Sequence, residues 1–180
     1  MLGVCIAAIN ISVAQNYFTK NGMISFYSKS PLENITAVSN QVVSVINTTT
    51  GETRFSVTIN GFKFRKALMQ VHFNENYMES EKYPKAIFAG TITNPGSVAF
   101  TKDGEYKASV SGDLTMHGVT KKITAPTVIT VKGGKFDGNS TFTVLLADYN
   151  ISIPAVVADK INKAIAVTII IPAYELLGAK

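Results

Sequence analysis

The sequence predicts an all-β protein whose antiparallel sheet closes into a barrel of about eight strands. Three observations support this fold class. Apolar and polar residues alternate along much of the chain, turn signals separate the alternating segments, and helical periodicity is confined to short stretches. Because so little helix is available to cover a sheet, we expect a sheet that closes on itself and leaves no exposed edge. A chain of 180 residues is expected to form one domain.

The clearest strand signal runs from Tyr106 to His117, where apolar residues or glycine occupy every second position. The same one-sided pattern recurs at 55–59, 123–131, 142–146 and 165–171. Each segment therefore reads as a strand with one apolar face. Turn signals lie at Asn21-Gly22, Thr50-Gly51-Glu52, Asn94-Pro95-Gly96, Asp103-Gly104, Gly133-Gly134 and Asp137-Gly138. Short turns of this kind join neighbouring antiparallel strands, so hairpins are expected.

The apolar positions change parity at Gly61. They are odd-numbered up to Ile59 and become even-numbered at Phe62 and Phe64. A bend or bulge at a glycine produces such a change, and the rim of a barrel is a common place for it.

Residues 65–83 depart from period two and predict an amphipathic helix. One face carries Leu68, Val71 and His72, and a neighbouring stripe carries Met69, Phe73 and Tyr77. Pro84 disfavours a helical conformation at the residue before it and ends the segment. A shorter helical turn is expected at about 154–162, before the last strand.

Residues 1–14 carry no charge, are mostly apolar, and end in Ser12-Val13-Ala14 before Gln15. These small residues resemble a signal-peptidase site, although a basic region before the apolar run is missing. The segment is either a truncated signal peptide or an ordinary N-terminal element, and we expect export. The only cysteine, Cys5, lies in this segment, and Val4 before it is unlike a lipoprotein signal. The barrel domain is expected to span residues 15–180.

The charge pattern and the missing motifs narrow the function. The chain has 17 basic and 12 acidic residues, but the cations are scattered, which argues against nucleic-acid binding. A modest positive field favours contact with an anionic membrane surface. The only histidines, His72 and His117, have no metal-ligand spacing, and no nucleophile elbow or phosphate-binding loop occurs. No catalytic residue, metal or cofactor is therefore expected.

A large apolar set could either fill the barrel or line a tunnel in it. Packed together, each large member contributes roughly 1.5–3 kcal/mol by burial and needs no ligand. Arg65 and His72 are polar candidates for the mouth of a tunnel, although His72 can equally be a structural residue. The candidate tunnel-lining residues are Phe26, Phe55, Val57, Ile59, Leu68, Met69, Phe88, Val110, Leu114, Met116, Ile129, Phe142, Val144 and Ile169.

Two linked motifs resemble the signature stretches of the YceI-like, polyisoprenoid-binding family. They are Glu81-Lys82-Tyr83-Pro84-Lys85-Ala86-Ile87-Phe88 and Gly112-Asp113-Leu114-Thr115-Met116-His117-Gly118-Val119-Thr120-Lys121. Residues 64–80 also resemble the helix that precedes the first motif in members from Bacteroidetes-type bacteria. Met116 stands where leucine is usual, and Lys122 where proline often follows.

The resemblance implies an extended, lipocalin-like antiparallel barrel in the bacterial periplasm, with an apolar tunnel that holds an isoprenoid or fatty chain. The family is not known as an enzyme. The leading hypothesis is thus carriage or storage of an isoprenoid or other long-chain lipid without chemistry, with transient membrane contact and a homodimer as further partners. The alternatives are a solid-core barrel that acts as a protein-interaction or scaffold module, and an uncharacterised enzyme.

Overall fold

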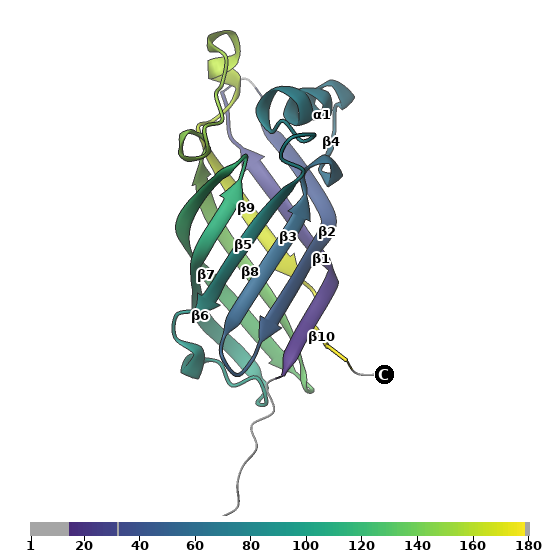
Figure 1. Ribbon diagram of the computed structural model, residues 1–180, viewed down its shortest axis with the longest axis vertical. Helices are drawn as coiled ribbons and strands as arrows, with labels where there is room; N and C mark the ends of the chain where they lie inside the picture. The colour runs from purple at the N-terminus through teal and green to yellow at the C-terminus, as the bar shows by residue number, and fades with distance from the viewer. Residues whose placement is uncertain (1–14, 32, 179–180) are drawn as a thin grey trace, which may run out of the picture.

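Eight strands form a closed antiparallel barrel in the computed structural model, which describes residues 15–31 and 33–178 (Figure 1). The strands are β1 (Asn16–Ser28), β2 (Ile35–Asn47), β3 (Glu52–Thr58), β5 (Lys85–Ile92), β6 (Gly104–Met116), β7 (Val119–Lys132), β8 (Lys135–Leu145) and β9 (Ala164–Ile171). Their order is β1-β9-β8-β7-β6-β5-β3-β2, and β2 pairs back to β1. The predicted fold class is confirmed. The predicted leader, residues 1–14, lies outside the described residues.

Two short strands extend the sheet at β1 and β2, the two strands whose pairing closes the barrel. β4 (Lys63–Phe64) pairs with β2, and β10 (Glu175–Leu176) pairs with the start of β1. The 3-10 turn η1 (Ile59–Gly61) lies just before β4 and produces the change of parity seen at Gly61.

Because apolar and polar residues alternate along the strands, the apolar face of each strand lies inside the barrel. On β6, Val110 lies opposite Ala125 of β7, and Leu114 follows on the same face. Both Val110 and Ala125 are buried, whereas Lys107 on the outer face of β6 is exposed. The period-two pattern of the sequence is therefore the inside-outside pattern of the barrel.

Two of the predicted turns are wrong, because Asn21-Gly22 lies within β1 and Asp137-Gly138 within β8. At Gly22 an added Cβ would lie 2.6 Å from Ile171 Cδ1, so glycine there permits close packing, and the β1–β2 register shifts around it. The turn between β7 and β8 is made by Gly133 and Gly134, whose φ angles of 57° and 75° suit a two-residue hairpin.

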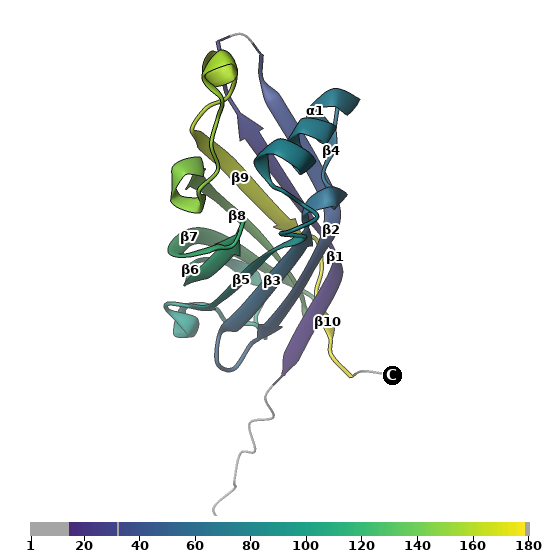
Figure 2. The same ribbon diagram turned by 45° about the horizontal axis from the view of Figure 1, so that its top comes forward.

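The helical segments gather mainly at the end of the barrel opposite the start of β1 (Figures 1 and 2). α1 (Ala67–His72) continues into the π-helical turn η2 (Phe73–Tyr77), inside the predicted range. Near them in Figure 1 lie two 3-10 segments, η4 (Leu146–Tyr149) and η5 (Ala155–Lys160). The 3-10 turn η3 (Pro95–Ser97) lies at the other end. None of the helices in the described part of the chain has the length and apolar character needed to cross a bilayer.

Aromatic side chains pack at the end where β1 begins. The Phe136 ring lies 4.8 Å from that of Tyr174, 4.9 Å from Tyr17 and 5.0 Å from Phe100, measured between centroids. We call these four residues the basal aromatic cluster. Because Phe136 and Tyr174 are both buried, the cluster fills this end of the barrel.

Candidate ligand-binding site

The barrel encloses an apolar cavity of about 550 Å³, to which all eight barrel strands contribute side chains. Its lining begins at Phe136 and Tyr174 in the basal aromatic cluster and continues to Leu68 of α1 and Lys160 of η5 at the other end. The cavity therefore extends along the barrel. Its volume is in the range that small-molecule binding sites occupy.

Every apolar residue that the sequence analysis named as a tunnel candidate lines this cavity. Most come from the inner faces of strands, Ile59 comes from η1, and Leu68 and Met69 come from α1. His72 also lines the cavity, whereas Arg65 lines a smaller adjoining pocket of about 310 Å³. Contact of these residues with a ligand stays a prediction.

The sequence analysis named Phe26 of β1 but missed other cavity residues of β1 and those of β2, among them Ile24, Val42 and Ile46. Their alternation is hard to read because buried hydroxyl residues such as Ser28 and Ser44 share these strands. Each of these hydroxyls has a hydrogen-bond partner. Ser28 Oγ accepts from the Asn162 backbone N–H at 2.9 Å, and Ser44 Oγ bonds the Tyr174 hydroxyl at 2.7 Å.

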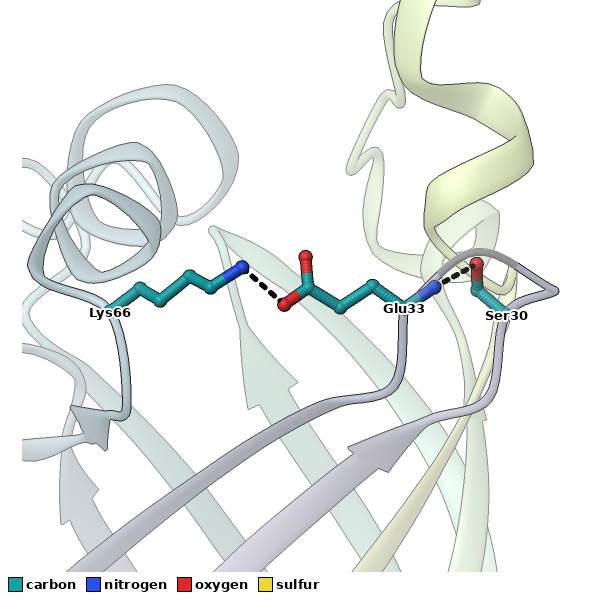
Figure 3. Close-up of polar contacts among 3 residues, drawn as sticks. All are labelled: Ser30, Glu33 and Lys66. Carbon is teal, nitrogen blue, oxygen red and sulfur yellow. Dashed lines mark hydrogen bonds and ion pairs between the residues drawn. The ribbon is translucent and has the colours of Figure 1, made fainter.

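Several polar and charged side chains of the cavity lie at its open end. We call this end the rim; it comprises α1, the described residues of the β1–β2 connection (29–31, 33 and 34) and η5. The Lys66 ammonium, just before α1, lies 2.5 Å from Glu33 Oε1 on the β1–β2 connection (Figure 3). Ser30 Oγ accepts from the Glu33 backbone N–H at 3.5 Å and donates to the Asp159 carbonyl oxygen at 2.9 Å. The three parts of the rim are thus joined by polar contacts.

The rim also exposes apolar side chains. Leu68 and Val71 on α1 are 65% and 43% exposed, and Val156 on η5 is 88% exposed.

His117 lies outside the cavity and has structural contacts. Its Nδ1 lies 2.8 Å from the Tyr149 carbonyl oxygen, and its Nε2 lies 2.9 Å from a carboxylate oxygen of Glu79. The Tyr83 ring packs against the imidazole with centroids 4.9 Å apart. Next to it, Gly118 has a φ of 73°, and a Cβ there would lie 2.7 Å from the Tyr83 ring. The two signature motifs therefore meet at a corner of the fold.

Three tyrosines that face or border the interior have a raised pKa. Burial raises the pKa of Tyr77, which lines the cavity, and that of Tyr149, where Asp148 adds to the effect. Burial raises the pKa of Tyr174 to about 12. Over the described residues, no group of three or more His, Cys, Asp or Glu is arranged to hold a metal ion.

Comparison with known proteins shows the family to which the chain is similar. The YceI-like domain family matches residues 15–173. A UPF0312 protein of Pseudomonas putida strain GB-1 is 35% identical over 98 residues, which are 51% of this chain and 47% of the relative. A UPF0312 protein of Pseudomonas syringae pv. tomato strain DC3000 is 34% identical over 87 residues, or 45% and 42%. The matched region spans about half the length of these curated relatives.

Solved structures share the fold. A polyisoprenoid binding domain from Saccharophagus degradans, implicated in plant cell wall breakdown, matches with a TM-score of 0.76 and 15% identity over 91% of this chain and 99% of that one. BcnA of Burkholderia cenocepacia matches with a TM-score of 0.69 and 13% identity over 86% and 96%. A YCEI protein of Campylobacter jejuni matches with a TM-score of 0.54 and 14% identity over 99% and 94%. At these identities the likeness concerns the fold.

Proposed function

The chain belongs to the family of YceI-like domains, and from this premise we propose that its barrel binds an isoprenoid or other long-chain lipid and carries or stores it without chemistry. The observation that carries the proposal is the apolar cavity of about 550 Å³ along the barrel. Moving a lipid chain from water into such a cavity is favourable by about 0.8 kcal/mol per CH₂. A barrel filled by its own side chains, as the scaffold alternative requires, would leave no cavity of this size.

An isoprenoid is the preferred ligand class because the Saccharophagus degradans neighbour is described as a polyisoprenoid binding domain. The wall of the cavity is suited to a branched chain, since it is built mainly from isoleucine, valine and phenylalanine side chains. Extraction of the purified protein with organic solvent, followed by mass spectrometry, tests this. We expect a stoichiometric long-chain lipid in the extract and binding of an isoprenoid alcohol to the delipidated protein.

The hydrogen bonds of two buried serine hydroxyls support carriage of a lipid without a chemical reaction. In the described chain, Ser28 and Ser44 are held by hydrogen bonds to Asn162 and Tyr174, and His72 is the only histidine that lines the cavity. These contacts do not pair a hydroxyl nucleophile with a base. Recovery of the bound lipid unchanged after prolonged incubation tests this part of the proposal, and a modified lipid would contradict it.

We further propose that the protein works in the periplasm, where a carrier is needed because a lipid chain must cross water between two membranes. The uncharged apolar run at residues 1–14 supports export. Fractionation of cells that express the gene with its native N-terminus, together with N-terminal sequencing, tests this. We expect a periplasmic protein that begins at Gln15, and a cytoplasmic protein that begins at Met1 would contradict export.

Loading of such a carrier requires the rim to approach a bilayer. The exposed side chains of Leu68 and Val156 lie on two sides of the cavity entrance, and Lys66 and Lys160 add positive charge beside them. Apolar side chains flanked by cations suit the interface of an anionic membrane. We therefore propose transient docking of the rim on a membrane surface.

A further inference from the structure

The base of the barrel is closed, and we propose that it sets the longest chain that the cavity accepts. Phe136 and Tyr174 form the floor on which the far end of the chain stops, and Gly138 leaves space just above this floor. The inference rests on the proposed lipid binding and adds to it a limit on chain length and the residues that set this limit.

The floor is backed by packed side chains. Val131 is the ladder partner of Phe136 and is buried, but it lies outside the lining of the cavity. Phe100 of the basal aromatic cluster also lies outside the lining, and its ring centroid is 5.0 Å from that of Phe136. A chain that enters from the rim therefore ends on the rings of Phe136 and Tyr174.

Hydrogen bonds hold the floor in place. The Tyr174 backbone N–H donates to the Phe136 carbonyl oxygen at 3.1 Å, and the Tyr174 hydroxyl bonds Ser44 Oγ at 2.7 Å. Ser44 and both rings are buried. If Tyr174 moved aside, the Ser44 hydroxyl would be left without this partner, which is costly for a buried polar group. We therefore expect the floor to stop a longer chain rather than to open for it.

Gly138 lies directly above the floor, two residues from Phe136 and on the same inner face of β8. Its ladder partners are Ile129 of β7 and Ile171 of β9, and all three residues line the cavity. The two isoleucines are buried, whereas a Cβ added to Gly138 would meet nothing within 4 Å. The missing side chain thus leaves a notch in the wall, and this notch admits the last part of a chain.

The depth of the cavity gives the expected limit. Phe136 and Val144 both line the cavity from β8 and lie eight residues apart. At about 3.4 Å per residue and a strand tilt of about 40°, this spacing corresponds to roughly 20 Å along the barrel axis. An extended chain advances about 1.2 Å per bond, or about 5 Å per isoprene unit. The floor should therefore limit the buried chain to about four isoprene units.

The test measures how binding depends on chain length. All-trans isoprenoid alcohols of two to six units are offered, one at a time, to an equal mixture of delipidated wild type and one variant. Native mass spectrometry then measures how the alcohol divides between the two proteins. Because both proteins compete for the same alcohol, its limited solubility affects them equally. Thermal unfolding of each variant shows whether it is folded.

Gly138→Leu fills the notch above the floor. An alcohol of two units can lie nearer the rim and should divide equally between the two proteins. Alcohols of four or more units need the full depth, so they should bind the variant at least about tenfold more weakly, because the last part of the chain stays in water. A loss of the same size at every length would contradict the proposed limit.

Phe136→Ala opens the floor and should act in the opposite direction. Alcohols of five and six units should bind this variant at least about fivefold more tightly than the wild type, because more of the chain is buried. Phe100→Ala is the matched control, since it removes the same atoms from the basal aromatic cluster at a position outside the lining. Every alcohol should divide equally between Phe100→Ala and the wild type.

The outcomes distinguish this inference from the proposed function. If the division in Gly138→Leu and Phe136→Ala does not depend on chain length, the limit set by the base is wrong while lipid binding stands. If Phe136→Ala does not fold, Gly138→Leu decides alone, because its side chain enters open space. If no alcohol binds to the folded, delipidated wild type, lipid binding and the limit on chain length are both overturned.

Discussion

At the scale of single residues, Tyr174 is the buried group whose ionisation bears most on the stability of the barrel. Its ring stacks on Phe136 in the basal aromatic cluster, and its hydroxyl bonds Ser44 Oγ at 2.7 Å. Burial raises its pKa to about 12 from 10.0, and the bond to Ser44 opposes only part of this rise. The neutral phenol is thus the form that the folded protein accepts.

This pKa difference predicts a loss of stability in alkali. Because the folded pKa is the higher one, the contribution of Tyr174 is fully present below about pH 10 and is lost as the pH rises towards 12. Its size is roughly 2–3 kcal/mol, the energy of about two pKa units. In Tyr174→Phe the alkaline loss should shrink, although the free energy of unfolding at pH 7 should fall by about 1–3 kcal/mol because Ser44 loses its partner.

Chemical denaturation between pH 7 and pH 12 measures both effects. Tyr27→Phe is the control, since Tyr27 is 40% exposed and lies on the same barrel. The control should retain the alkaline loss of the wild type. An equal alkaline loss in Tyr174→Phe would show that other groups cause it.

At the scale of elements, the close approach of β5 and β6 depends on a pair of glycines. Gly90 and Gly112 are direct partners in the ladder. A Cβ on Gly112 would lie 2.3 Å from the Ala89 carbonyl oxygen and 2.4 Å from Gly90 Cα. These contacts are with backbone atoms, so the two strands would have to separate to accept a side chain.

Gly112→Ala should therefore lower the free energy of unfolding by about 1–3 kcal/mol, as overpacking of a well-packed site does. Gly138→Ala is the matched control, because Gly138 also lies within a strand and an added Cβ there meets nothing within 4 Å. Its stability should equal or exceed that of the wild type, since alanine loses less backbone freedom on folding. Urea unfolding measures both, and equal stabilities of the two variants would contradict the close approach.

The helical elements of the rim lead to a prediction about membranes. Replacing Leu68 and Val156 together with serine removes apolar surface that we expect to enter the bilayer interface. Flotation with vesicles that contain anionic lipid should show binding weakened by roughly tenfold, since a large apolar side chain contributes about 1.5–3 kcal/mol when fully buried. Delivery of lipid to or from vesicles should slow in parallel.

The control pair for this experiment is Leu176 and Leu177, which are 40% and 53% exposed near the opposite end of the barrel. Replacing both with serine removes comparable apolar surface from the end of the barrel opposite the rim. This double variant should bind vesicles like the wild type. Equal effects of the two double variants would mean that the rim has no special role in docking.

At the scale of the whole molecule, function depends on whether the interior is open space or tightly packed core. Val110 lies near the middle of β6, is buried and lines the cavity. Val110→Trp places a large ring in the path of a bound chain. If the cavity is open, lipid affinity should fall at least tenfold while stability changes by less than about 1 kcal/mol. If the barrel is packed, overpacking should cost about 1–3 kcal/mol.

Lys107→Trp is the matched control, because Lys107 is exposed on the outer face of the same strand and the ring would add bulk outside the barrel. It should bind lipid like the wild type. The natural chain contains no tryptophan, so the fluorescence of each variant reports one position. Stability is measured on delipidated protein, since bound lipid raises the unfolding midpoint. Unchanged lipid affinity in Val110→Trp would contradict binding along the barrel.

The sequence by itself indicated β3, β6, β7, β8 and β9 and which of their faces are apolar, whereas it marked no strand at β1, β2 or β5. Along β6, the alternation that ends in Leu114 and Met116 is local, and it records which side chains leave water on folding. The tunnel candidates were found for the same reason. Glycine was less informative: Gly133 makes a turn, whereas Gly22 and Gly138 lie within strands, because a residue without a side chain serves either purpose.

Only the tertiary structure decided what the apolar faces enclose. A pattern cannot tell side chains that touch one another from side chains that surround a cavity, since both leave water equally. It also could not join Glu33 to Lys66, which lie 33 residues apart and meet only because the β1–β2 connection and α1 share one end of the barrel. The cavity and its charged rim are products of closure, because closing the sheet sets the width of the interior and brings distant connections together at its ends.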